Sequence, residues 1–172
     1  MGKPGYEYLI TYQYSIEIYD LTADFVTRFL PGREWVRTRE QMIQAARSCK
    51  QNIVEGYMEK STKSYIKLLG VARASLEELL EDFRDYSRGH GIELRDKWDK
   101  REKRENTGKY LLPLDPLHPL DPFIPVNYMV NLIRRTTYLL DRQMAALERK
   151  FVTEGGYTEK LFQKRLAYRR GS

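Results

Sequence analysis

The residues best suited to chemistry are basic side chains in the last quarter of the chain. Five lie in a predicted helix and five in the segment after it: Arg134, Arg135, Arg142, Arg149, Lys150, Lys160, Lys164, Arg165, Arg169 and Arg170. Residues 157–172 contain five of these positive charges and one acidic side chain, Glu159. Such side chains neutralise phosphates, so we expect contacts to RNA or DNA, with Tyr157 or Tyr168 stacking on an unpaired base. Alternatively, this segment is a helix packed on the same or a neighbouring subunit, with its charges in solvent.

An acidic cluster near the middle of the chain is the second candidate for chemistry. It consists of Glu77, Glu78, Glu81, Asp82 and Asp85. Carboxylates in helical bundles can hold two metal ions, but those sites also use Glu-x-x-His motifs, and neither His90 nor His118 follows a glutamate at that spacing. We therefore expect no metal and no cofactor, and ion pairs with Arg73, Arg84 and Arg88 instead. Without a phosphate loop, a nucleophile elbow or a His-Glu-x-x-His motif, the chain is not expected to be an enzyme.

The elements that position these residues are predicted to be helices. Apolar or small residues alternate at spacings of three and four over residues 9–30, 42–56, 65–86 and 126–151. In the first segment the expected buried stripe is Leu9, Tyr12, Ile16, Tyr19, Ala23, Val26 and Leu30. Four such stripes bury one another most simply in an antiparallel up-down bundle. We predict an all-α four-helix bundle over residues 1–154 and a short basic C-terminal helix within residues 155–172.

The corner between the second and third helices contains several polar and small residues. We expect Gly56 to end the second helix in a left-handed conformation and Ser61 to cap the third. Asn52 and Glu55 would then bind free backbone N–H groups of the loop or nearby lysines. At the start of the second helix, Thr38 is expected to be the N-cap, with a glutamine three residues later completing a capping box.

These corner residues belong to a longer pattern. Its members are Asn52-Ile53, Glu55-Gly56, Ser61, Tyr65, Leu69, Ala72, Ser75 and Glu78-Leu79. Over residues 38–86 the pattern resembles that of the four-helix proteins first noted in intervening sequences of bacterial 23S rRNA genes, although Val54 and Tyr65 replace the usual Ala and Phe. The resemblance implies a compact bundle, often a ring-like homopentamer without catalytic residues. Related accessory proteins of diversity-generating retroelements are basic pentamers that associate with nucleic acid and a reverse transcriptase.

An insert over residues 89–125 separates the third and fourth helices. Gly89-His90-Gly91 should break or kink the third helix. The charged residues 95–105, around Trp98, should form a solvated helix with near-neighbour ion pairs or, alternatively, bind RNA. Prolines then recur at every third residue from Pro113 to Pro125. This is the polyproline II period, so we expect a strap along the bundle or, alternatively, a PxxP ligand for a partner protein.

The remaining features concern location and partners. The single Cys49 permits no intrachain disulfide and is expected in the core, which suits a reducing cytoplasm. No apolar run resembles a signal peptide or a membrane span, so we expect a soluble, cytoplasmic protein without a membrane partner. Two functions remain open. One is an oligomeric nucleic-acid-associated protein, and the other is a scaffold or accessory subunit that docks a partner chain through the bundle, the strap or the tail.

Overall fold

Five α-helices make up most of the part of the chain that this computed structural model describes, residues 2–94 and 122–171. They are α1 (Ile10–Phe29), α2 (Val36–Met58), α3 (Thr62–Gly89), α4 (Phe123–Glu154) and α5 (Tyr157–Gly171). Short 3-10 turns, η1 (Gly5–Tyr8) and η2 (Arg33–Trp35), precede α1 and α2. No strand occurs in these residues, so the all-α prediction is confirmed. None of the described helices is long and apolar enough to cross a bilayer.

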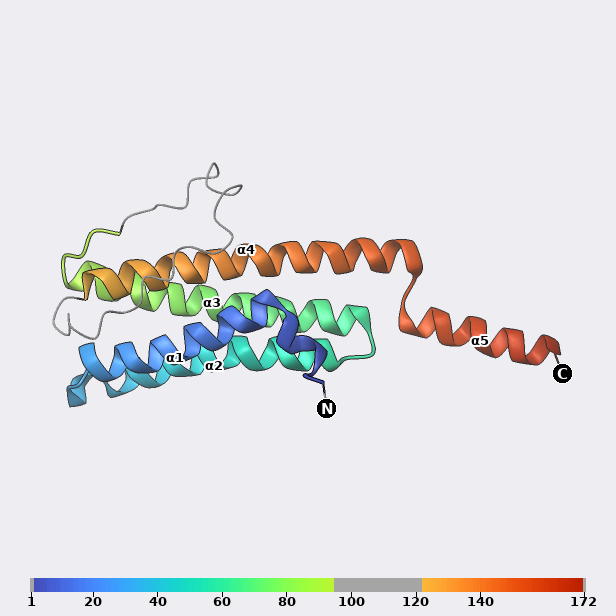
Figure 1. The fold of residues 1–172 in the computed structure, drawn as a ribbon, viewed down its shortest axis with the longest axis horizontal. Coiled ribbons are helices and arrows are strands. Elements are labelled where there is room, and N and C mark those ends of the chain that lie inside the picture. Colours follow the sequence, from blue (N-terminus) through green and yellow to red (C-terminus); the bar gives the residue numbers. More distant parts are fainter. Residues whose placement is uncertain (1, 95–121, 172) are drawn as a thin grey trace.

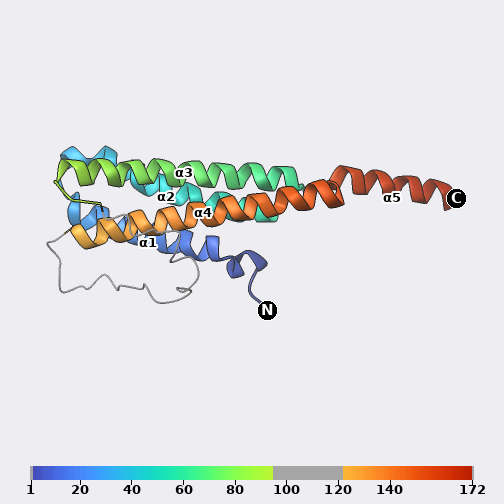
Figure 2. The ribbon, with the colours of Figure 1, turned by 90° about the horizontal axis from the view of Figure 1, so that it is seen from above.

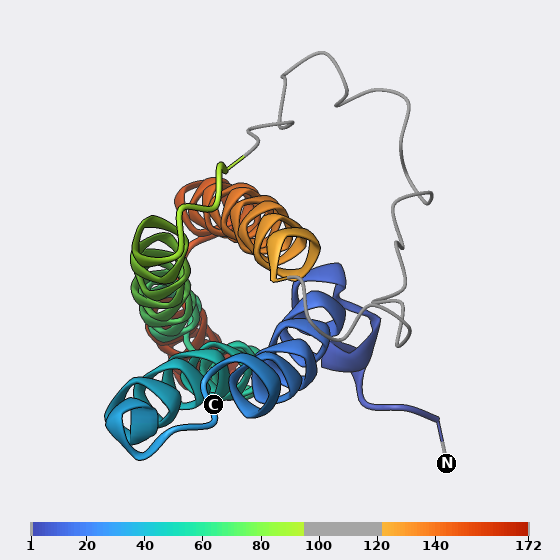
Figure 3. The ribbon, with the colours of Figure 1, turned by 90° about the vertical axis from the view of Figure 1, so that its left-hand side faces the viewer.

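The first four helices form an antiparallel up-down bundle, as predicted. Figure 3 views it end-on: each helix packs against the next, and α4 closes the ring against α1. Figure 1 shows that α4 extends past the turn between α2 and α3, and that α5 lies beyond it. The same projection is visible from above in Figure 2. The end of α4 and all of α5 therefore lie outside the four-helix core.

The core is densest between α2 and α3, where the predicted stripes are confirmed. All five predicted positions of α2 are buried: Met42, Ala46, Cys49, Ile53 and Gly56. On α3, Leu76 and Phe83 are fully buried, and the Phe83 ring lies 4.9 Å from that of Phe25 on α1. Burial raises the pKa of the Cys49 thiol to about 12, so this cysteine is a neutral core side chain. Each large apolar side chain buried here stabilises the fold by about 1.5–3 kcal/mol.

The buried stripe predicted for α1 is wrong in part. Val26 and Leu30 are buried, but the remaining predicted positions are only half-buried. The innermost line is instead Thr11, Ser15, Ile18, Thr22 and Phe25. Two of these hydroxyls are satisfied within the helix, because Ser15 donates to the carbonyl of Tyr12 at 2.7 Å and Thr22 donates to that of Ile18 at 2.6 Å. Small hydroxyl residues can therefore face the core of the bundle.

The predicted N-cap of α2 is also wrong. The helix begins two residues before Thr38, because η2 runs directly into it with Trp35 at the N-cap position. The connection is secured by Arg39, which donates hydrogen bonds to the carbonyls of Leu30 and, at 2.8 Å, Gly32. The intended capping-box residue, Gln41, bonds Asp82 of α3 instead. The hydrogen bonds from Arg39 to the carbonyls that follow α1 thus take the place of the expected capping box.

Glycines end α3 and α4 as predicted. His90 is the C-cap of α3, and Gly91 follows with φ 65°. Gly155, with φ 71°, is the C-cap of α4. At the other end of α4, Pro125 lies in the first helical turn, where its missing N–H costs no helical hydrogen bond. The last part of the predicted strap is therefore helical, while residues 95–121, with the charged run and most of the proline repeat, lie outside the described residues.

Candidate nucleic-acid interface

A pair of serines links α2 to α3, while Asn52 forms its hydrogen bonds within α2. Asn52 Nδ2 donates to the Ser48 carbonyl, one turn back on α2, at 2.8 Å. The Ser48 and Ser75 hydroxyl oxygens lie 2.8 Å apart across the interface, and Ser75 donates to the Val71 carbonyl at 3.1 Å. The expectation that Asn52 binds the loop is therefore wrong. Ser75 contributes to the packing of α3 on α2, and Asn52 bonds to its own helix.

Gly56 serves a close contact and adopts no left-handed turn. Its φ is negative, and α2 continues through it to Met58. A Cβ at this position would lie 2.8 Å from the ring of Tyr65 and 3.3 Å from Cβ of Leu68, both on α3. The expected C-cap role is therefore wrong, and the absence of a side chain is what allows α3 to approach.

The other motif residues differ in their roles. Ser61 is the N-cap of α3, as predicted, and its hydroxyl accepts a long hydrogen bond from the Ser64 N–H at 3.5 Å. Glu55 and Glu78 are exposed. Within the described residues, no ion pair joins Glu55 to a lysine, so that part of the expectation is wrong.

A chain of hydrogen bonds that the sequence did not reveal connects three helices near the same end of the bundle. Gln143 of α4 donates to the Tyr65 hydroxyl at 2.7 Å and accepts from Thr11 of α1 at 2.9 Å. Tyr57 packs edge-on against Tyr65, with ring centroids 6.2 Å apart. This polar and aromatic layer stabilises the bundle where α4 begins to leave it.

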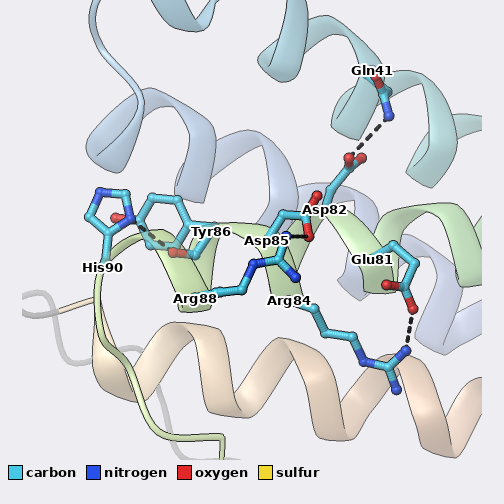
Figure 4. A network of polar contacts seen from close by, with 8 residues as sticks. All are labelled: Gln41, Glu81, Asp82, Arg84, Asp85, Tyr86, Arg88 and His90. Atoms are coloured by element: carbon cyan, nitrogen blue, oxygen red, sulfur yellow. Dashed lines mark hydrogen bonds and ion pairs between the residues drawn. The ribbon is translucent and has the colours of Figure 1, made fainter.

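Two carboxylates of the acidic cluster, Glu81 and Asp85, form ion pairs within α3, as Figure 4 shows. Arg84 bonds Glu81, and Arg88 bonds Asp85 at 2.7 Å, both as expected. Arg73 differs, because it pairs with Asp141 of α4 at 2.7 Å. Within the described residues, no group of three or more His, Cys, Asp or Glu side chains could hold a metal ion.

Asp82 is the acidic residue with the most perturbed environment. Its Oδ1 accepts a hydrogen bond from Gln41 at 3.0 Å, while Oδ2 is buried and has no partner in the described residues. Burial raises the pKa of Asp82 to about 6, with smaller contributions from the carboxylates of Asp85 and Glu78. This carboxylate is therefore a source of pH-dependent stability in the α2–α3 interface.

The basic residues of α4 differ in how exposed they are. Arg135, Arg142 and Arg149 recur every seventh residue and so share one face of the helix. Their surroundings differ: the Arg135 guanidinium lies 5.1 Å above the ring of Tyr14, a contact between α4 and α1. Arg149 and Lys150 are exposed at the projecting end, whereas Arg134 is half-buried nearer the start of the helix. From Arg135 to Arg149 the helix rises about 21 Å, so the basic residues are spread along α4.

The basic residues of α5 lie beyond that projecting end. Glu159, the one acidic residue of α5, accepts a hydrogen bond from the Gly156 N–H at 2.5 Å and so helps to start the helix. Lys160 pairs with Glu154 at 3.5 Å. The four cations that follow are exposed and form no ion pair with any described residue: Lys164, Arg165, Arg169 and Arg170. With Arg149 and Lys150, they make a basic extension outside the bundle.

Similarity to known proteins concerns the first half of the chain. A search of curated proteins found no match. Residues 7–91 match the family described as 23S rRNA-intervening sequence protein, and this range holds α1, α2 and α3 with the whole corner motif. The ten basic candidates all lie after the matched range. Over residues 7–91, the chain is therefore similar to the 23S rRNA-intervening sequence protein family.

Proposed function

We propose that this protein is a non-catalytic, homo-oligomeric bundle that binds RNA or DNA through α5 and the end of α4. The observation that carries the proposal is the set of four exposed cations on α5 without a carboxylate partner in the described residues. The family description is compatible with an association with nucleic acid. The buried thiol of Cys49 suits the reducing cytoplasm, where we propose that the protein acts.

Electrostatics determines how such an extension would bind. Each Lys or Arg that neutralises a phosphate releases condensed counterions, so affinity falls steeply as salt rises. Contacts to phosphates carry no sequence information. We therefore expect binding with little sequence preference and with a strong dependence on salt.

Self-association is part of the proposal. On α1 and just before it, Ile10 and Tyr8 are 54% and 67% exposed, and Tyr12, Ile16 and Tyr19 are only half-buried. An apolar and aromatic surface of this kind supports contact between copies of the chain. The family resemblance adds a ring-like homopentamer as the expected assembly. Light scattering at micromolar concentration that returned a mass near 20.4 kDa would contradict it.

A protein-interaction scaffold is the second candidate. It is supported by the exposed apolar side chains at the end of α4, where Val152 is 81% and Phe151 36% exposed. Residues of this part of α4 line a shallow depression: Ala145, Glu148, Arg149, Val152 and Thr153. A partner chain docked there would retain its binding when the charges of α5 are removed.

Two variants with equal net charge test the first candidate. One replaces Lys164, Arg165, Arg169 and Arg170 with Gln. The control replaces four exposed basic residues of the bundle with Gln: Arg33, Arg37, Arg47 and Lys67. For duplex DNA, log K falls as log salt rises. The magnitude of this slope should become smaller by about 3 to 4 in the first variant only. Equal behaviour of the two variants would contradict binding through α5.

A further inference from the structure

The side chains of α5 combine charge with exposed rings. Phe162 is 59% and Tyr168 79% exposed, although large apolar groups are usually covered. Arg165 lies three residues from each ring in sequence, which places it about one helical turn from both. Every aromatic ring in this part of α5 therefore has a cation as its neighbour on the helix surface.

The distribution of these residues around α5 separates the kinds of partner. A helix that enters a membrane surface or an apolar groove carries its apolar residues on one face and its charges on the other. On α5 the two kinds are interleaved. Leu161 and Phe162 lie about 100° apart around the helix axis. Lys164 follows Leu161 by three residues and Arg165 follows Phe162 by three, so each apolar side chain has a cation beside it. No continuous apolar face is left for a membrane or a groove.

Duplex and single-stranded nucleic acids also differ in what they offer such a helix. A duplex presents phosphates to the cations, but its bases are stacked and paired. A single strand presents phosphates and unpaired bases, on which aromatic side chains stack with little sequence preference. Only the single strand uses both kinds of side chain on α5.

We infer that α5 binds single-stranded RNA or DNA, with Phe162 and Tyr168 stacking on unpaired bases while Lys164, Arg165 and Arg169 neutralise the adjacent phosphates. This inference rests on the proposed function and specifies its ligand class. The projection of α5 from the bundle leaves its sides open to a strand (Figure 1). Residues of the core take no part in the contact.

The test measures fluorescence anisotropy of full-length protein with an unstructured single-stranded RNA of about 20 nucleotides and a blunt duplex of the same length. Phe162→Leu removes the ring but keeps an apolar side chain, and Phe162→Tyr restores a ring. Val71→Ala is the matched control, because it trims an exposed apolar side chain of α3, which lies outside α5 and the end of α4. The replacements on α5 leave the core intact.

We expect Phe162→Leu to lower single-strand affinity about tenfold, with duplex affinity within about twofold of wild type, while Phe162→Tyr and Val71→Ala bind normally. An equal loss for both probes, or no loss for either, would overturn the inference and leave the proposed function standing. If the wild-type protein binds neither probe at low salt, the proposed function itself fails.

Discussion

The hairpin of α2 and α3 and the extension formed by the end of α4 and α5 use polar residues in opposite ways. In the hairpin, Asn52, Ser48 and Ser75 bond one another or their own helices. In the extension, Lys164 and Arg165 are exposed and have no ion-pair partner among the described residues. The hairpin falls within the family match, and the extension falls outside it. The family motif thus explains packing, while the candidate binding residues belong to the part of the chain that the family does not cover.

This contrast is sharpest for one substitution made in both regions. Phe83 is fully buried beside Phe25, whereas Phe162 is 59% exposed. Phe83→Ala should lower the free energy of unfolding by about 3–5 kcal/mol, and Phe162→Ala should change it by less than about 0.5 kcal/mol. Urea denaturation followed by circular dichroism measures both. Similar losses in the two variants would mean that α5 packs as part of the core.

Glycines allow a second comparison, within the hairpin. Gly56→Ala places a Cβ 2.8 Å from the Tyr65 ring and should cost about 2 kcal/mol of stability. Gly70→Ala is the control, because a Cβ there meets nothing within 4 Å on a helix that Ala favours. It should stabilise the protein by about 0.5–1 kcal/mol. The same sign for both changes would refute the close-contact role of Gly56.

The pKa of Asp82 predicts a pH-dependent effect in the same interface. Its value of about 6 in the folded protein exceeds the value of about 3.9 for an unfolded chain. Ionisation therefore costs stability as pH rises from about 4 to 6. Asp82→Asn retains an acceptor for Gln41 and should stabilise the protein by about 1 kcal/mol at pH 7.5, since the half-buried charge is partly screened. Denaturation at pH 4 and 7.5 should show the gain only at the higher pH; a gain that is equal at both would exclude this cause.

The smallest expected effect concerns the start of α3. Ser61→Ala removes the hydroxyl that caps the helix through a long hydrogen bond of 3.5 Å. Helix caps contribute about 0.5–2 kcal/mol, and this geometry favours the low end, about 0.5 kcal/mol. Ser61→Asn should retain the wild-type melting temperature. An Ala variant as stable as wild type would mean that packing alone, without the Ser61 cap, stabilises the start of α3.

The sequence predicted what depends on near neighbours along the chain. The stripes of α2 and α3 could be predicted because residues three and four apart share a helix face. The role of Gly56 could not, since it depends on how closely α3 approaches α2. The stripe of α1 was wrong because Thr22 and Ser15 satisfy their hydroxyls inside the helix and can face the core.

The candidate binding site shows the same limit. Charge counting along residues 157–172 identified the basic segment, but charge says nothing about whether a helix packs on its own bundle. The separation of α5 from the core emerges only from the length of α4 relative to its neighbours (Figure 2). Gln143, which links α1, α3 and α4, carries no local signal.

The central claim is that the bundle folds without α5 and that α5 binds nucleic acid. The most direct measurement compares the full chain with a variant truncated after Gly156, by urea denaturation and by binding to single-stranded RNA at two salt concentrations. We predict an unfolding free energy within about 0.5 kcal/mol of the full chain and a loss of affinity of about 100-fold at low salt. A truncated protein that unfolds readily, or that binds RNA as tightly as the full chain, would contradict the claim.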